Sequence, residues 1–143
     1  REALAQNDFV AAEKWAETAK GFKDTDEVKA LLDEIDKSRQ YKKHLDLGKE
    51  LVSQGSYVKG LQELWEAQKI KDIQEVRDLI RDTDYWRNFV RGKALMNDGK
   101  LTEARAVLLI AKRIKDTPEV QAYIKLVDDM LKSQGESKSE NPK

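Results

Sequence analysis

The sequence contains no cysteine and only two prolines in 143 residues. The absence of cysteine excludes disulfides and thiolate metal sites. It also removes the residues that would indicate whether the protein works in an oxidising or a reducing compartment. No apolar run approaches the roughly 20 residues that span a bilayer. This absence, together with the lack of a visible signal peptide, predicts no membrane insertion and a cytoplasmic location. Lys plus Arg equals Asp plus Glu at 27 each, so the basic excess typical of a nucleic-acid binder is also missing.

What the sequence does contain favours helix. Aromatic residues make up only 7% and charged residues 38%, and Ala, Leu, Glu and Lys are abundant. A chain of 143 residues fits one domain with a sizeable core. Because the first residue is Arg1 rather than Met, we expect the chain to be a fragment or a processed product.

One heptapeptide occurs three times with small variations. It reads FKDTDEV at 22–28, IKDIQEV at 70–76 and IKDTPEV at 114–120, which gives offsets of 48 and 44 residues. Neighbouring positions follow the same offsets, and they pair apolar with apolar residues and small with small residues. Examples are Phe9, Tyr57 and Leu101; Ala12, Gly60 and Ala104; and Ala19, Ala67 and Ala111. Matches at so many spaced positions predict a repeat protein.

Within each unit the apolar residues recur every three or four positions, which is the period of an amphipathic helix. We expect helices at about 8–22, 26–54, 57–71, 74–97, 101–115 and 118–134. The repeated heptapeptide is interpreted as a turn followed by a capping box, with Asp24–Glu27, Asp72–Glu75 and Asp116–Glu119 in the two capping roles. The four-residue difference between the two offsets is about one helical turn, so it is placed inside the long helix 26–54.

These motifs resemble the tetratricopeptide repeat. The resemblance lies in Leu47-Gly48-x-x-Leu51 and in Gly55-x-Tyr57-x-x-Gly60-x-x-x-Leu64-x-x-Ala67, with Asp72 at the closing position. It implies an all-α, right-handed solenoid of helical hairpins with about three repeats, the first truncated. Paired helices would approach closely at Gly48 with Gly60 and at Gly92 with Ala104. The sequence departs from the family in its period, which is 44 to 48 residues instead of about 34, and in the closing proline, which is replaced by aspartate.

The expected organisation is a single repeat domain followed by a tail. Residues 1–134 form the domain, with units at about 1–25, 26–73 and 74–117 and a capping helix at 118–134. Residues 135–143 carry no apolar side chain and are predicted to be a disordered tail. The first helix has an apolar stripe broad enough to be covered on two sides, so we expect an upstream segment or another subunit to cover it.

Residues for catalysis or metal binding are scarce. His44 is the single histidine, and its carboxylate neighbours Asp46 and Glu50 have no catalytic or ligand spacing. We interpret His44 as a surface or interhelix residue. The sequence predicts no enzyme activity, no metal site and no cofactor.

In the tetratricopeptide family the first helices of the hairpins line a groove that holds peptides. The corresponding residues here would be Arg1, Lys42, Leu45, Lys49, Trp86, Phe89, Lys93, Met96 and Asn97. Arg1, Lys49 and Lys93 are aligned cations, which favours a partner with acidic groups, although they can also be ordinary solvated residues. Trp86 with Phe89 is interpreted either as an apolar anchor for a ligand or as packing between helices.

The sequence therefore favours a non-catalytic scaffold that binds a protein or peptide. The alternative is a structural spacer or self-association segment of a larger protein. Exposed and clustered basic residues with an exposed Trp86 would favour the first function, and a buried Trp86 with scattered charges would favour the second.

Overall fold

The computed structural model describes residues 9–22 and 25–140, with side chains described within 9–18 and 25–135. Every regular element in these ranges is an α-helix, which confirms the all-helical prediction. The helices are α2 (Phe9–Phe22), α3 (Asp26–Ser53), α4 (Tyr57–Ile70), α5 (Gln74–Asn97), α6 (Leu101–Ile114) and α7 (Pro118–Glu140). The predicted boundaries agree to within one residue, apart from the end of the last helix.

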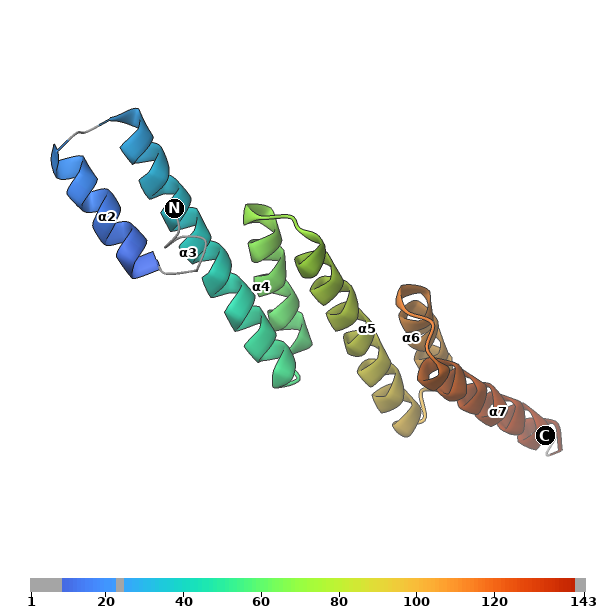
Figure 1. Cartoon of the computed structure of the whole chain (residues 1–143). Coiled ribbons are helices and arrows are strands. Elements are labelled where there is room, and N and C mark those ends of the chain that lie inside the picture. The colour runs from blue at the N-terminus through green and yellow to red at the C-terminus, as the bar shows by residue number, and fades with distance from the viewer. Residues whose placement is uncertain (1–8, 23–24, 141–143) are drawn as a thin grey trace.

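The helices form an extended row in which each one packs against the next along the chain (Figure 1). α5 also contacts α7, two places further on. The buried side chains accordingly fall into separate clusters instead of one central core. The clusters are Ala12, Ala16 and Ile35 between α2 and α3; Leu45, Leu64, Ala67 and Val76 across α3, α4 and α5; and Tyr85, Phe89, Leu101, Ala104, Leu108, Ala111, Val120 and Val127 across α5, α6 and α7. Such nearest-neighbour burial is typical of repeat arrays.

Two glycines end the long helices in the same way. Gly55 and Gly99 adopt positive φ angles of 81° and 78°, a conformation that is unfavourable for residues with a Cβ atom. The Gly55 N–H donates to the Val52 carbonyl at 3.0 Å, and the Ser56 N–H donates to the Leu51 carbonyl at 2.9 Å. This Schellman pair, which recurs around Gly99, satisfies carbonyls left open at the helix end and turns the chain into α4.

Helices α3 and α4 approach closely at a pair of glycines, as predicted. A Cβ atom added to Gly48 would lie 2.9 Å from Leu64 Cδ2 and 3.3 Å from the Gly60 carbonyl oxygen. In the next hairpin, a Cβ atom on Gly92 would lie 2.6 Å from Leu108 Cδ2. Buried leucines of the second helices therefore occupy the space that side chains at these glycines would need.

The predicted capping box before α5 is wrong, because the helix begins one residue too late for it. Ile73 occupies the N-cap position and makes no side-chain cap, while Asp72 lies outside the helix. At α3 and α7 the cap is the residue after the predicted one: Thr25 accepts from the Val28 N–H at 3.3 Å, and Thr117 from the Val120 N–H at 3.1 Å. Asp24 lies outside the described residues.

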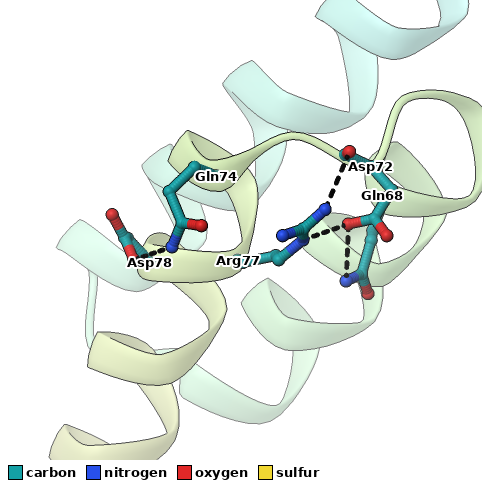
Figure 2. A network of polar contacts seen from close by, with 5 residues as sticks. All are labelled: Gln68, Asp72, Gln74, Arg77 and Asp78. Carbon is teal, nitrogen blue, oxygen red and sulfur yellow. Dashed lines mark hydrogen bonds and ion pairs between the residues drawn. The ribbon is translucent and has the colours of Figure 1, made fainter.

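Asp72 instead fastens the turn between α4 and α5 (Figure 2). Its Oδ1 accepts from Arg77 Nε at 2.8 Å and from Gln68 Nε2 at 3.3 Å, so one carboxylate oxygen joins the end of α4 to the start of α5. The hydrogen bond from Arg77, followed by that from Gln68, holds the pKa of Asp72 below its ordinary value. The aligned Asp116 accepts from Gln121 at 2.8 Å, which keeps the five-residue spacing of Asp72 and Arg77.

The last helix is longer than predicted. α7 continues to Glu140, so residues 135–140, which the sequence assigns to a disordered tail, are helical. This segment, GESKSE, contains one glycine and no proline, so every residue in it keeps the backbone N–H that a helix requires. Residues 141–143 lie outside the described part.

Candidate functional site

The residues predicted to line a groove lie on α3 and α5 and differ in exposure. Leu45 and Phe89 are only 8% and 4% exposed, so they support the surface from below and do not reach it. Trp86 is 47% exposed and is the largest apolar side chain of this set at the surface. Lys42, Lys49 and Asn97 are exposed, and Lys93 and Met96 are half-buried. Arg1 lies outside the described residues.

Trp86 stands on a small aromatic cluster. Its ring meets Tyr85 edge-on at 5.2 Å and Phe89 edge-on at 5.8 Å between ring centroids. Phe89 in turn meets Tyr123 of α7 edge-on at 5.4 Å. The buried rings restrict the position of the indole while nearly half of it faces solvent, and this is the arrangement of a pre-organised apolar contact.

Lys93 lies beside this cluster and contacts rings from two helices. Its Nζ is 5.2 Å from the centroid of Phe89 on α5 and 5.5 Å from that of Tyr123 on α7. Cation–π attraction holds an ammonium group at such distances. No carboxylate of the described residues forms an ion pair with Lys93, so its charge is not neutralised by a neighbour.

The cations of α3 have different surroundings. Lys49 Nζ lies 3.7 Å from Glu75 Oε1 of α5, and Lys42 Nζ lies 2.8 Å from Asp46 Oδ2 on its own helix. The two aligned lysines therefore differ. Lys49 is paired with a carboxylate of another helix, and Lys93 lies over aromatic rings. The aligned neighbours also differ, because Phe89 and Tyr123 are found where the earlier unit has Leu45 and Leu79.

Tyr123 belongs to this surface, although it is not among the residues predicted to line the groove. The sequence already indicates this difference. Tyr123 is 44 residues after Leu79, so it occupies the position that leucine has in the unit of the paired Lys49. A tyrosine in place of leucine at that position introduces a ring within reach of α5. The interhelix distance that brings Lys93 over the ring could be obtained only from the structure.

A second lysine–tyrosine contact occurs in both hairpins. Lys71 and Lys115 are the C-cap residues of α4 and α6, and their Nζ atoms lie 5.6 Å and 5.9 Å from the centroids of the Tyr41 and Tyr85 rings. Burial, followed by the charge of Glu75, raises the pKa of Tyr41 above its ordinary value. Because the contact is the same in both units, we regard it as part of the hairpin structure and not of a binding site.

The three tryptophans are all substantially exposed, but their surroundings differ. Trp15 on α2 is 60% exposed and Trp65 on α4 is 44% exposed. Within the described residues, only Trp86 contacts other aromatic rings. Exposure alone therefore does not single out Trp86, whereas its supporting rings and the neighbouring cation do.

His44 joins two helices, which agrees with its interpretation as an interhelix residue. Its Nδ1 lies 2.6 Å from Oε2 of Glu63 on α4, and about a quarter of each side chain is exposed.

The described side chains form no group of three or more metal-ligating residues suited to an ion. None of the described helices combines the length and the apolar character needed to cross a bilayer.

Comparison with known proteins identifies no relative. No protein family, no curated protein and no solved structure matches the chain significantly. The resemblance to the tetratricopeptide repeat therefore remains a prediction based on the residues quoted above.

Proposed function

We propose that this chain is a non-catalytic scaffold that binds a partner peptide or protein on the face formed by α3, α5 and α7. In this proposal the helical row is a right-handed solenoid similar to the tetratricopeptide repeat, with each hairpin extended by its longer first helix. Contacts between the first helices support such a common face. Lys49 of α3 reaches Glu75 of α5, and Phe89 of α5 meets Tyr123 of α7.

The observation that carries the proposal is the exposure of Trp86 over buried rings. A tryptophan that is 47% exposed and held edge-on to Tyr85 and Phe89 presents apolar area at little entropic cost. Such residues commonly provide most of the binding energy at protein interfaces. A spacer would gain no stability from leaving this indole in water.

Lys93 indicates that the proposed partner carries an acidic group. An ammonium group held by two rings, with no paired carboxylate among the described residues, is available to an acidic group of the partner. The equal numbers of acidic and basic residues argue against nucleic acid as the partner. The cytoplasmic location stays a prediction from the sequence.

A phage-displayed library of short random peptides, selected on the immobilised chain, tests the proposal. Peptides that bind the wild type are then measured on Trp86→Ser and on Trp65→Ser, whose indole is similarly exposed on α4. We expect Trp86→Ser to weaken binding about thirtyfold, since a hot-spot residue contributes about 2 kcal/mol. Trp65→Ser should bind as the wild type does. Equal binding by both variants, or no selected peptide at all, would contradict the proposal.

The alternative function, a self-association or spacer segment, is favoured by one observation on α2. Trp15 is 60% exposed there, whereas the aligned Glu63 in α4 contacts the first helix of its own hairpin through His44. Trp15 thus lies where a further helix could pack, which is consistent with the expectation that another segment or subunit covers α2. Sedimentation equilibrium of the wild type and Trp15→Ser distinguishes the two functions. A dimer that Trp15→Ser dissociates supports self-association, and a monomer at all concentrations excludes it.

A further inference from the structure

Equivalent positions in α3, α5 and α7 carry three different exposed side chains. Trp86 is 44 residues after Lys42, and Met130 is 44 residues after Trp86. Lys42 is exposed, and Trp86 and Met130 are 47% and 37% exposed. From α3 to α7, this row of three equivalent positions therefore carries a cation, an indole and a thioether.

The burial pattern supports this equivalence. Lys42 precedes Leu45 by three residues as Trp86 precedes Phe89, and both of the later residues are buried in the core. Trp86 also follows the buried Thr83 by three residues, as Met130 follows the buried Val127. These shared buried positions give each pair of helices a similar rotation next to the three residues, although Arg39 and Ser133, which align with Thr83 and Phe89, are exposed.

The three helices also run in the same direction. Figure 1 shows α3, α5 and α7 descending one after another along the row. Their contacts fix the order, because Lys49 of α3 reaches Glu75 near the start of α5, and Lys93 of α5 reaches Tyr123 near the start of α7. An extended chain crossing this face would meet the Lys42, Trp86 and Met130 positions in that order.

We propose that the partner is an extended peptide with an acidic residue at one end of its binding motif, over Lys42 of α3, and apolar residues at the other, over Trp86 of α5 and Met130 of α7. The acidic group proposed for Lys93 is a separate contact, two helical turns along α5 from Trp86. This inference rests on the proposed function and adds the order of the partner's side chains. Trp86 and Met130 offer apolar area, and a methionine side chain adapts to different apolar partners.

Lys42 supplies the charge that sets the direction. Its ion pair with Asp46 is solvent-exposed on both sides and therefore weak, so a partner carboxylate can compete for the ammonium group. Lys49, two helical turns further along the same face of α3, is a second cation and pairs with Glu75 of α5. Reversing the peptide would place its acidic group against the Met130 thioether and its apolar side chains against lysine.

The test repeats the random-peptide selection on charge-swapped and polar variants. We expect Lys42→Glu to replace the acidic residue at one end of the selected motif by Lys or Arg, with the apolar residues unchanged. Met130→Asp should remove the apolar preference at the opposite end and weaken the wild-type peptides about tenfold. Lys43→Glu, on the adjacent exposed residue outside the row, is the control and should select the wild-type motif.

The outcomes separate this inference from the proposed function. If Lys42→Glu selects the wild-type motif while Trp86→Ser loses it, the binding face stands and the order of side chains is wrong. Preference changes at the same end of the motif for Lys42→Glu and Met130→Asp would also overturn the order. If Trp86→Ser retains all selected peptides, the proposed face itself is wrong, and this inference fails with it.

Discussion

Arg105 on α6 donates a hydrogen bond from Nε to Oδ1 of Asp128 on α7, with the two atoms 2.6 Å apart. The residue aligned with Arg105 is the fully buried Leu61 in α4, and in α2 it is Glu13, which pairs with Arg39 of α3. One position of the repeat therefore holds an acid, a leucine and a base. The two charged residues at this position each pair with the following helix, but with partners at different positions of that helix.

We expect removal of the Arg105–Asp128 pair to destabilise the chain only slightly. Both side chains are more than two-fifths exposed, so Arg105→Gln should lower the free energy of unfolding by about 0.5 kcal/mol. Urea unfolding at low and high salt measures this, and the difference between variant and wild type should shrink in high salt. Asp128→Asn should cost the same, and the double variant should cost no more than either. Additive losses would show that the two residues act independently.

Gly92→Ala should destabilise the hairpin of α5 and α6. The new methyl group would lie 2.6 Å from Leu108 Cδ2, and Leu108 is fully buried and has little room to move. Overpacking of this kind costs about 1–3 kcal/mol. The matched control is Gly135→Ala in α7, where a Cβ atom would meet nothing within 4 Å. Thermal unfolding followed by circular dichroism should show a lower Tm for Gly92→Ala only, and an unchanged Tm would contradict the close approach.

The Asp72–Arg77 contact should make stability depend on pH on the acid side. The folded protein lowers the pKa of Asp72 below its unfolded value, so the carboxylate contributes stability above the unfolded pKa. This contribution is lost as the pH falls through the folded pKa. Asp72→Asn should therefore lower Tm at pH 7 and have a smaller effect at pH 2 to 3. Arg77→Gln should remove the same pH dependence, and equal effects of Asp72→Asn at both pH values would contradict it.

The helices could be predicted from the sequence because each depends on local signals. The three-to-four-residue apolar period gives their extent, and Gly55 and Gly99 mark the ends of the long helices, where positive φ is required. The capping-box prediction was wrong because the Asp-x-x-Glu pattern does not determine whether the aspartate or the residue after it is the N-cap. Asp72 lies before the N-cap Ile73 and accepts a hydrogen bond from Arg77, on the other side of the turn.

The site could be predicted only in part. Trp86, Phe89 and Lys93 lie on one helix, and their helical spacing places them together, which the sequence already indicates. Tyr123 joins them from a helix that begins 25 residues after Lys93, and its ring position depends on how closely α7 packs on α5. The division between a paired Lys49 and an unpaired Lys93 likewise depends on contacts between helices that no local pattern encodes.

The position of Lys93 over two rings can be tested without any partner. Protons above an aromatic ring are shifted upfield, so the ε-methylene protons of Lys93 should resonate upfield of those of the other lysines in an NMR spectrum. Tyr123→Leu, which introduces the type of residue found at the aligned Leu79, should reduce this shift while Phe89 keeps part of it. The stability loss should be about 0.5–1.5 kcal/mol, the contribution of an edge-to-face ring pair beyond its buried area.

Tyr41→Leu is the matched control, because it removes a ring that lies under Lys71 and not under Lys93. It should leave the Lys93 signal in place. An unshifted Lys93 signal in the wild type would show that the ammonium group and its stem are free in solution. The charge would then not be pre-organised, and Lys93 would be an ordinary solvated lysine.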